Sequence, residues 1–213
     1  MQEPSDGDLL RRFQAGDTAA FEALVERYEC ALLRHARSIL GDGRCHEDVV
    51  QDVFLRLVQS PPRVPRSAAG RAGLERAHLL SWLHRVTRNC CLDVVRSETR
   101  RRKREEAVAA AEPADGGLAS VEAGDTREAV ARGLQRLPSD QREVLTLRLL
   151  GEQSYREIAE ITGKKIGTVG WLVSTGLKAL SSELAPLLQG RGPGTAAGGP
   201  GATQVACLQG KLS

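Results

Sequence analysis

The sequence predicts an all-α protein made of two small helical domains joined by a flexible linker. Only 3% of its 213 residues are aromatic, so leucine, valine and alanine must form most of the core. Apolar residues recur at the three- and four-residue spacing of an α-helix over several segments. The alternating runs of β-branched and aromatic residues that are typical of strands are scarce.

Charge is distributed in blocks along the chain, although the net charge is only +3. Residues 1–60 carry 7 lysines and arginines and 11 acidic residues, whereas residues 76–104 carry 9 and 2. Residues 105–125 contain 6 acidic residues and no basic one, and residues 126–213 contain 11 basic and 7 acidic residues. Such alternation indicates modules with different partners.

The first domain, residues 8–104, is expected to contain helices that pack on one another. One follows an apolar stripe that starts at Phe21 and ends at a Gly-Asp-Gly turn. The next follows a stripe from Val49 to Val58 and ends at Ser60-Pro61-Pro62, because proline cannot continue a helix. The third stripe starts at Leu79 and runs at helical spacing into a basic segment.

The helix from Val49 to Val58 has an acidic outer face formed by Glu47, Asp48, Gln51 and Asp52. This face would suit a basic protein partner. It is also what a solvated surface helix commonly shows, so the residues alone leave both interpretations open.

The third helix carries a face suited to nucleic acid. Lysine and arginine side chains that neutralise phosphates release counterions, so such binding would weaken steeply with salt. Trp82 lies beside this face and would either stack on an unpaired base or belong to the core. The outward polar residues are Ser81, Arg85, Arg88, Asn89 and Arg96, followed by the run Arg100, Arg101, Arg102, Lys103 and Arg104.

Two segments are not expected to fold alone. Residues 105–125 are rich in alanine, glutamate and glycine and are predicted to form an acidic flexible linker. Residues 190–213 are dominated by glycine, alanine and proline and are predicted to be a disordered tail. Whether this tail has a regulatory role stays open.

The second domain, residues 126–189, begins with an apolar pattern that predicts two helices interrupted at Pro138-Ser139, the second ending at Gly151. Its leucines and valines lie at helical spacing. The apolar positions are Leu134, Leu137, Val144, Leu145, Leu147 and Leu150.

A helix-turn-helix is predicted over residues 154–180. Ser154 and Glu157 have the spacing of a capping box, which satisfies free amides at a helix start. Gly163 would supply the turn, and Val169 would face back onto the first helix. An ordinary helical hairpin remains the alternative; in a helix-turn-helix, the second helix would enter the DNA major groove.

The cysteines and histidines do not define a metal site. The 5 cysteines form no Cys-x-x-Cys pair, which favours a reducing compartment over a disulfide framework. We expect no metal and no other cofactor; the alternative, an enzyme built on these residues, would require stoichiometric zinc or iron. The residues with zinc-binding side chains but no recognised ligand spacing are Cys45, His46, His84, Cys90 and Cys91.

No segment approaches the roughly 18 consecutive apolar residues of a membrane span. The N-terminal segment Met-Gln-Glu-Pro-Ser-Asp is acidic, whereas a signal peptide would begin with basic residues. We therefore expect a cytoplasmic protein with no direct membrane insertion.

Three ordered segments resemble the extracytoplasmic-function (ECF) group of bacterial RNA polymerase sigma factors. They are Glu47–Phe54, Trp82–Asn89 with Asp93 and Arg96, and Leu137–Val169 with its proline, turn and helix-turn-helix residues. The resemblance implies a non-enzymatic protein that directs core RNA polymerase to specific promoters and promotes DNA melting. The implied partners are core RNA polymerase, promoter DNA and an anti-sigma factor, which in this family is often membrane-bound.

The resemblance also implies roles for the two domains and for single residues. The first domain would be sigma region 2, which docks on the polymerase and melts the minus-ten element; the second would be region 4, which reads the minus-thirty-five element. The polymerase-binding motif is matched by Asp48, Gln51, Asp52 and Phe54. The minus-ten helix is matched by Trp82, Arg85, Arg88, Asn89, Asp93 and Arg96. DNA contacts of the helix-turn-helix are expected from Tyr155, Arg156, Lys164, Lys165, Thr168, Trp171, Ser174 and Lys178.

The recognition helix, residues 166–180, departs from the family pattern. It has no cation before Lys178, and Gly170 and Gly176 would each weaken it by about 1 kcal/mol relative to alanine. Lys164 and Lys165 precede it, so phosphate contacts are expected at the helix start. The segment 60–78 looks like a long proline-containing loop, and the promoter preference of the family is therefore not carried over.

A regulator that binds duplex DNA alone through its helix-turn-helix is the competing interpretation. In that protein the acidic face between Asp48 and Asp52 would have no partner. A test of binding to core polymerase distinguishes the sigma factor interpretation from the regulator interpretation.

Overall fold

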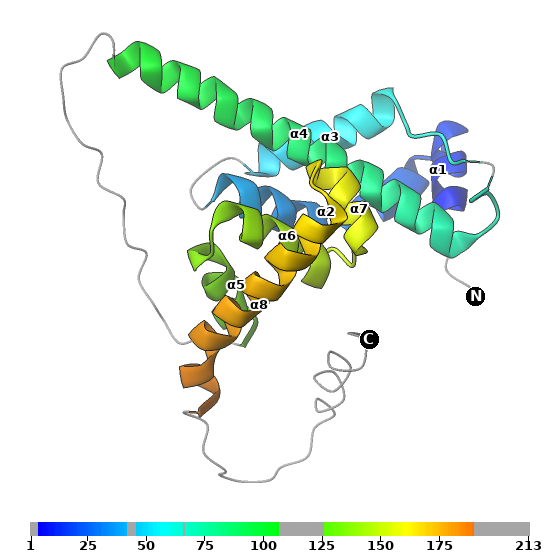
Figure 1. Cartoon of the computed structure of the whole chain (residues 1–213). Helices are drawn as coiled ribbons and strands as arrows, with labels where there is room; N and C mark the ends of the chain where they lie inside the picture. The colour runs from blue at the N-terminus through cyan, green and yellow to red at the C-terminus, as the bar shows by residue number, and fades with distance from the viewer. Residues whose placement is uncertain (1–3, 42–45, 66, 107–125, 190–213) are drawn as a thin grey trace.

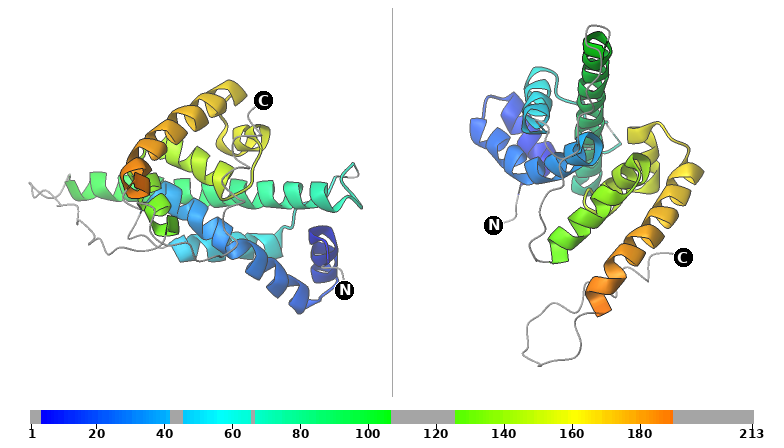
Figure 2. Two further views of the ribbon diagram at one scale, coloured as in Figure 1. Left: turned by 90° about the horizontal axis from the view of Figure 1, so that it is seen from below. Right: turned by 90° about the vertical axis from the view of Figure 1, so that its left-hand side faces the viewer.

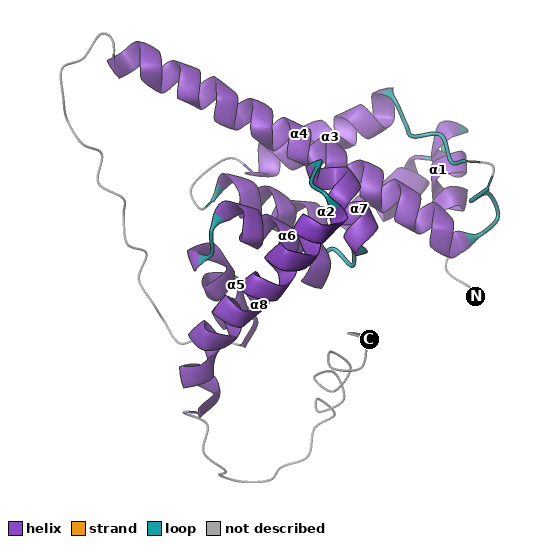
Figure 3. Cartoon of the chain, viewed as in Figure 1, coloured by secondary structure: helices purple, strands orange, loops and turns teal. Residues whose placement is uncertain are grey.

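The structure is a computed structural model, and it describes residues 4–41, 46–65, 67–106 and 126–189. Across these ranges every regular element is an α-helix, which confirms the predicted all-α class (Figures 1 and 3). The helices are α1 (Asp6–Gln14), α2 (Thr18–Leu40), α3 (His46–Gln59), α4 (Ala72–Glu106), α5 (Thr126–Arg136), α6 (Ser139–Leu149), α7 (Tyr155–Thr162) and α8 (Ile166–Gln189).

Helices α1 to α4 share one cluster of buried apolar side chains. Leu24, Leu32, Val53, Leu57 and Leu83 are all fully buried in it. They come from α2, α3 and α4, so the stripes predicted in these three helices do form a common core. Burial of a leucine side chain contributes about 1.5–3 kcal/mol, which makes this cluster a main source of stability.

Helix α1 was not predicted from the sequence. Its N-cap is Ser5, whose hydroxyl oxygen accepts a hydrogen bond from the Asp8 amide at 3.1 Å. Leu9 and Leu10 bury their side chains against the common core. Two adjacent leucines in a short helix give a weak periodic signal, although the serine cap is a recognisable start.

Helix α4 begins at Ala72, seven residues before the expected start at Leu79. The loop expected over residues 60–78 is therefore shorter. The reason is Glu75, which is only 1% exposed and accepts a hydrogen bond from the Gly70 amide at 2.9 Å. The same carboxylate accepts hydrogen bonds from the Ser5 hydroxyl at 3.3 Å and from the Arg11 guanidinium at 3.4 Å. One buried side chain therefore connects the loop and α1 to α4.

Helices α5 to α8 form a second buried cluster that includes Leu145, Leu147, Ile158 and Val169, each fully buried. As predicted, α5 and α6 are separated at Pro138. Two residues of the predicted stripes lie outside the cores, because Val58 of α3 is 45% exposed and Leu150, just after α6, is 37% exposed.

The predicted helix-turn-helix is formed by α7 and α8. The Ser154 hydroxyl accepts from the Glu157 amide at 3.3 Å, and the Glu157 carboxylate accepts from the Ser154 amide at 2.7 Å, which completes the capping box. Gly163 has φ of 71°, a left-handed conformation that favours glycine. Val169 packs inward, as expected for the second helix of this motif.

Helix α6 lies between the two groups of helices. Glu143, Val144, Leu145, Thr146 and Leu147 are five consecutive buried residues, so this helix is covered on all faces. Helix α8 packs on it from the second domain and α2 from the first, while α4 contacts α7 (Figure 2). Apart from the end of α4, the predicted linker 105–125 lies outside the described residues, as does the predicted tail 190–213.

Candidate polymerase and nucleic-acid interfaces

The predicted docking face of α3 is present on the surface. Asp48, Gln51 and Asp52 are exposed on this helix. Phe54 is only 8% exposed and meets the Phe21 ring edge-on, with 6.2 Å between the ring centroids. The structure therefore brings the three polar residues together and places Phe54 in the core beneath them.

An apolar groove of about 450 Å³ runs between α2 and α3 beside this acidic face. Leu55 and Val58 line it and are 55% and 45% exposed, although neither was predicted as a site residue. Glu29 and Glu47 also line the groove. The combination can accept a helix with apolar and basic side chains, because exposed apolar patches rimmed by charge are typical of protein interfaces.

Four of the predicted minus-ten residues share one exposed face of α4. They are Arg85, Asn89, Asp93 and Arg96, whose spacing returns to the same side of a helix. Arg96 pairs with Asp93 at 3.2 Å across an exposed turn. Beyond them α4 projects from the bundle with an exposed basic segment, residues 100–104 (Figure 1).

The other two predicted minus-ten residues, Trp82 and Arg88, are partly buried, and Ser81, also predicted on this face, is buried. Trp82 is half-buried and packs against the first core, as a core residue would. The Arg88 side chain is 19% exposed, and its Nε donates a hydrogen bond of 2.7 Å to Oε1 of Glu143 in α6. Sequence periodicity could not reveal this partner, which lies 55 residues away in the second domain.

Two histidines complete a buried polar cluster around Glu143. The Nδ1 atoms of His35 and His84 are 3.1 Å apart, so one ring donates and the other accepts. Nε2 of His35 lies 3.7 Å from the same Glu143 oxygen, too long for a hydrogen bond. Nε2 of His84 has no hydrogen-bond partner and faces Gly151, where an added Cβ would lie 3.1 Å away.

Burial and charge shift the pKa values in this cluster. Burial, reinforced by repulsion from His35, lowers the pKa of His84 well below its usual value. Burial opposes ionisation of Glu143, but the nearby His35 and Arg88 outweigh it and lower the pKa of this carboxyl. Glu143 is therefore an anion and His84 a neutral ring near pH 7.

The two buried cysteines of α4, Cys90 and Cys91, have inert environments. Burial raises the pKa of Cys91 to about 12 and also raises that of Cys90, so neither is a thiolate near pH 7. The residues that the structure describes contain no group of three histidine, cysteine or acidic side chains placed to hold a metal. Cys45, part of the weak zinc pattern, lies outside those residues.

The helix-turn-helix exposes most of its predicted DNA contacts. Trp171 is 61% exposed on α8, and Gly167, one turn before it, offers no side chain to cover the indole ring. Tyr155 is half-buried beneath the Arg148 guanidinium, 5.3 Å from the ring centroid, and Lys164 pairs with Asp140 at 3.0 Å. The exposed predicted residues are Arg156, Lys165, Thr168, Trp171, Ser174 and Lys178.

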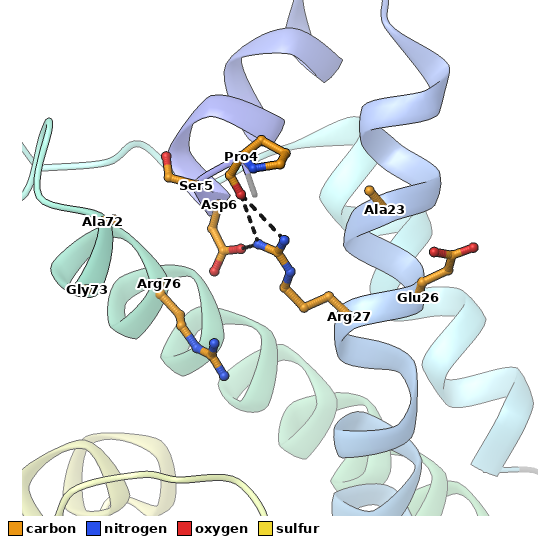
Figure 4. A pocket seen from close by; sticks show the side chains of 9 residues that line it. All are labelled: Pro4, Ser5, Asp6, Ala23, Glu26, Arg27, Ala72, Gly73 and Arg76. Atoms are coloured by element: carbon orange, nitrogen blue, oxygen red, sulfur yellow. Dashed lines mark hydrogen bonds and ion pairs between the residues drawn. The ribbon is translucent and has the colours of Figure 1, made fainter. Parts of the chain in front are cut away.

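A cavity of about 740 Å³ lies where α1, α2 and the start of α4 meet (Figure 4). Arg27 reaches across it to the Asp6 carboxylate and to the Pro4 carbonyl oxygen. Tyr28 also donates to Asp6, and burial raises the pKa of this phenol. These contacts hold α1 in place, and none of the predicted polymerase or DNA residues lines the cavity.

Comparison with known proteins identifies the family. The model described as Sigma-70 region 2 matches residues 24–101, and the model described as Sigma-70, region 4 matches residues 127–180. The chain therefore belongs to the sigma-70 family of RNA polymerase sigma factors, which act in promoter-specific transcription initiation. Within this family it is a member of the ECF group.

The similar proteins cover nearly the whole chain. The ECF RNA polymerase sigma-E factor of Escherichia coli K12 is 27% identical over 88% of this chain and 98% of its own length. RNA polymerase sigma-H factor of Pseudomonas aeruginosa PAO1 is 26% identical over 89% of this chain and 98% of its own length.

Two solved structures share the fold. The sigma factor RpoE from Bartonella quintana, in complex with the anti-sigma factor NepR, has a TM-score of 0.52 and 26% identity, covering 78% of this chain and 96% of that one. CnrH, in complex with the cytosolic domain of CnrY, has a TM-score of 0.52 and 23% identity, covering 89% of this chain and 100% of that one.

Proposed function

We propose that this sigma factor binds core RNA polymerase through α3 and promoter DNA through α4 and α8, without any covalent chemistry of its own. The main support is charge separation within the first domain. Exposed Asp48 and Asp52 on α3 stand beside an apolar groove, whereas exposed Arg85 and Arg96 lie on α4. Opposite charges on two neighbouring helices suit a basic protein and an acidic polymer.

The first domain is proposed to promote melting by capturing the separated minus-ten strand. Opening the duplex costs stacking energy, which contacts with unpaired bases and phosphates can offset. The exposed face with Arg85, Asn89 and Arg96 would bind the strand. Arg88 would join this surface only when it leaves Glu143.

The second domain is proposed to read the minus-thirty-five element with an apolar residue. Trp171 is exposed on α8, the helix with which a helix-turn-helix enters the major groove, and the thymine methyl group is the apolar feature there. Exposed Lys165 lies just before α8 and exposed Lys178 lies on it, and both would bind phosphates.

We place the two functional units at residues 8–104 and 126–189, with residues 105–125 as the linker. Simultaneous binding of two promoter elements raises the effective concentration of each unit at its own element. A linker between the units is what permits both contacts.

We infer that an anti-sigma factor is a further partner and that the protein acts in the cytoplasm. The solved complex of RpoE with the anti-sigma factor NepR supports the first inference. No helix in the described part of the chain is both long and apolar enough to cross a membrane.

Reversing the charge of Asp52 tests the docking assignment. Asp52→Arg should weaken binding to core RNA polymerase about tenfold, equivalent to about 1.4 kcal/mol, because it puts a cation on a face proposed to meet a basic partner. Equilibrium binding of labelled protein to core polymerase at low salt measures this. Glu22→Arg is the matched control, since Glu22 is exposed on α2 and does not line the groove.

Unchanged affinity of Asp52→Arg would show that α3 is not the docking element. Wild-type protein that binds duplex promoter DNA but never core polymerase would instead favour the alternative of an independent helix-turn-helix regulator. Transcription in vitro with core polymerase on genomic fragments would then identify the promoters that are recognised.

A further inference from the structure

The contact between the two domains covers Arg88, a residue that would extend the proposed DNA-binding surface of α4. Arg88 of α4 donates to Glu143 of α6 at 2.7 Å, and only 19% of the arginine side chain and 7% of the glutamate side chain are exposed. An arginine held in this way cannot bind a nucleic-acid phosphate at the same time. The acceptor that occupies it is itself an anionic oxygen, as a phosphate would be.

The contact around this pair is continuous rather than a single bridge. Five consecutive residues of α6, 143–147, are buried because α8 covers the helix from one side and the first domain from the other. Gly151, just beyond α6, lies against the His84 ring of α4. At the rim, Arg76 of α4 pairs with Glu152 at 3.3 Å.

The polar groups in this contact match each other only while the domains are closed. Glu143 is buried and anionic. Its charge is balanced by Arg88 of α4, and His35 of α2 lies close to the same carboxylate. Removing the Glu143 charge would leave Arg88 half-buried without its acceptor. The contact therefore depends on this one carboxylate.

We propose that the free sigma factor is closed, with α6 docked on α2 and α4 and the Glu143 carboxylate occupying the place on Arg88 that a phosphate of the minus-ten strand would take. Opening of this contact must precede full engagement of α4 with DNA. The surface of α2 and α4 is thus covered, in the free protein, by α6 of the same chain. The consequence for DNA rests on the proposed function of α4, whereas the closure itself does not.

Small-angle X-ray scattering of the full-length protein tests the closure. The wild type is expected to scatter as a closed particle, and Glu143→Arg, which sets a second cation against Arg88, should increase the radius of gyration. Glu183→Arg is the matched control, because Glu183 is an exposed acid of α8 that pairs with Arg136 inside the second domain. The charge-swapped double variant, Arg88→Glu with Glu143→Arg, should restore the wild-type radius.

Circular dichroism and thermal unfolding establish that each variant is folded. If Glu143→Arg fails to fold, Arg88→Glu disrupts the same ion pair from the side of the first domain. This variant should then show the larger radius of gyration. A wild-type protein that already scatters as two separated domains overturns the proposal, and so does an unchanged radius in the folded charge-reversal variants. Scattering involves neither polymerase nor promoter, so a negative result here leaves the proposed function standing, and the reverse also holds.

A DNA-binding measurement tests the role of Arg88 in the same contact. Glu143→Gln should bind fluorescein-labelled single-stranded DNA of mixed sequence several-fold more tightly than the wild type, because Arg88 is released. The gain should disappear in the double variant Glu143→Gln with Arg88→Gln. A gain that persists without Arg88 would overturn the idea that the carboxylate occupies a phosphate position.

Discussion

At the scale of single residues, Trp171 distinguishes the recognition helix of this protein from one that reads DNA through polar side chains. The indole ring is 61% exposed, and Gly167 one turn earlier leaves one side of it uncovered. Hydration of the exposed apolar indole surface is unfavourable, so a partner that covers this surface gains free energy. In the major groove, thymine methyl groups are such a partner.

Trp171→Ala should therefore reduce promoter recognition by about 1–3 kcal/mol and relax preference at a few adjacent base pairs. Competition binding of the holoenzyme to a library of minus-thirty-five sequences measures both quantities. Lys178→Ala is the matched comparison, since it should weaken all sequences alike and reduce the salt dependence of binding by about one ion. An unchanged sequence preference in Trp171→Ala would refute the assignment.

The exposed polar residues of α3 and α4 were predictable because helical spacing alone places Asp48 with Asp52 and Arg85 with Asn89. Phe54 was predicted as a docking residue but packs in the core, so its role in docking stays a prediction. The partner of Arg88 could not be predicted, since no local pattern relates it to Glu143. The same holds for Glu75, whose buried bonds depend on three separate segments.

At the scale of elements, two of the three glycines of α8, Gly170 and Gly176, have different roles. A Cβ on Gly176 would lie 2.8 Å from the Leu145 side chain of α6, so this glycine allows the two helices to approach closely. A Cβ on Gly170 would meet the Tyr155 ring at 3.9 Å, an ordinary contact distance. The sequence showed only that both residues weaken a helix.

Alanine substitutions should consequently change stability in opposite directions. Gly170→Ala is expected to stabilise the protein by up to about 1 kcal/mol through helix propensity. Gly176→Ala should destabilise it by about 1–3 kcal/mol, because the added methyl group overpacks the α6–α8 contact. Denaturant unfolding of both variants measures the difference, and equal effects would contradict the close approach at Gly176.

Elements that depend on contacts between chain neighbours could be predicted from the sequence, whereas elements that depend on distant contacts could not. The capping box and Gly163 turn of α7 involve neighbours along the chain, so they could be predicted closely. The start of α4 and the whole of α1 depend on Glu75 and on burial of Leu9 and Leu10 against other helices. Such tertiary contacts leave little periodic signal in a short segment.

At the scale of the whole molecule, closure should depend on pH through His84. This ring faces His35 of α2 and Gly151, and it lies one helical turn before Arg88 of α4, which donates to Glu143 of α6. Burial lowers its pKa in the closed form, whereas an exposed histidine titrates near pH 6.5. The open form therefore binds more protons below that pH.

Closure should weaken as the pH falls below about 6.5, by up to about 1.4 kcal/mol per pH unit for one proton. Glu143 contributes only at lower pH, because His35 and Arg88 lower the pKa of its carboxyl below the usual value and keep it charged there. Scattering between pH 7.5 and 5.5 should show the radius of gyration increasing in the wild type. His84→Gln, which cannot titrate, should remove this dependence, and a wild-type radius that stays constant would contradict it.

The charge blocks of the sequence indicated separate interfaces on α3 and α4, and the structure places these residues on separate helix surfaces. What the sequence could not indicate was that the two domains meet. Their contact includes the pair of Arg88 with Glu143, which are 55 positions apart, beside the pair of His35 and His84 inside the first domain. Each of these residues resembles an ordinary surface or core position when it is considered alone.

The enclosed position of α6 also limits how freely the parts of this protein can be exchanged. Its residues 143–147 must fit α8 on one side and the first domain on the other. A chimera that takes its second domain from another sigma factor would keep the core of that domain but lose the match to His35, His84 and Arg88. Modular replacement therefore requires the facing surface of α2 and α4 to be transplanted together with the new domain.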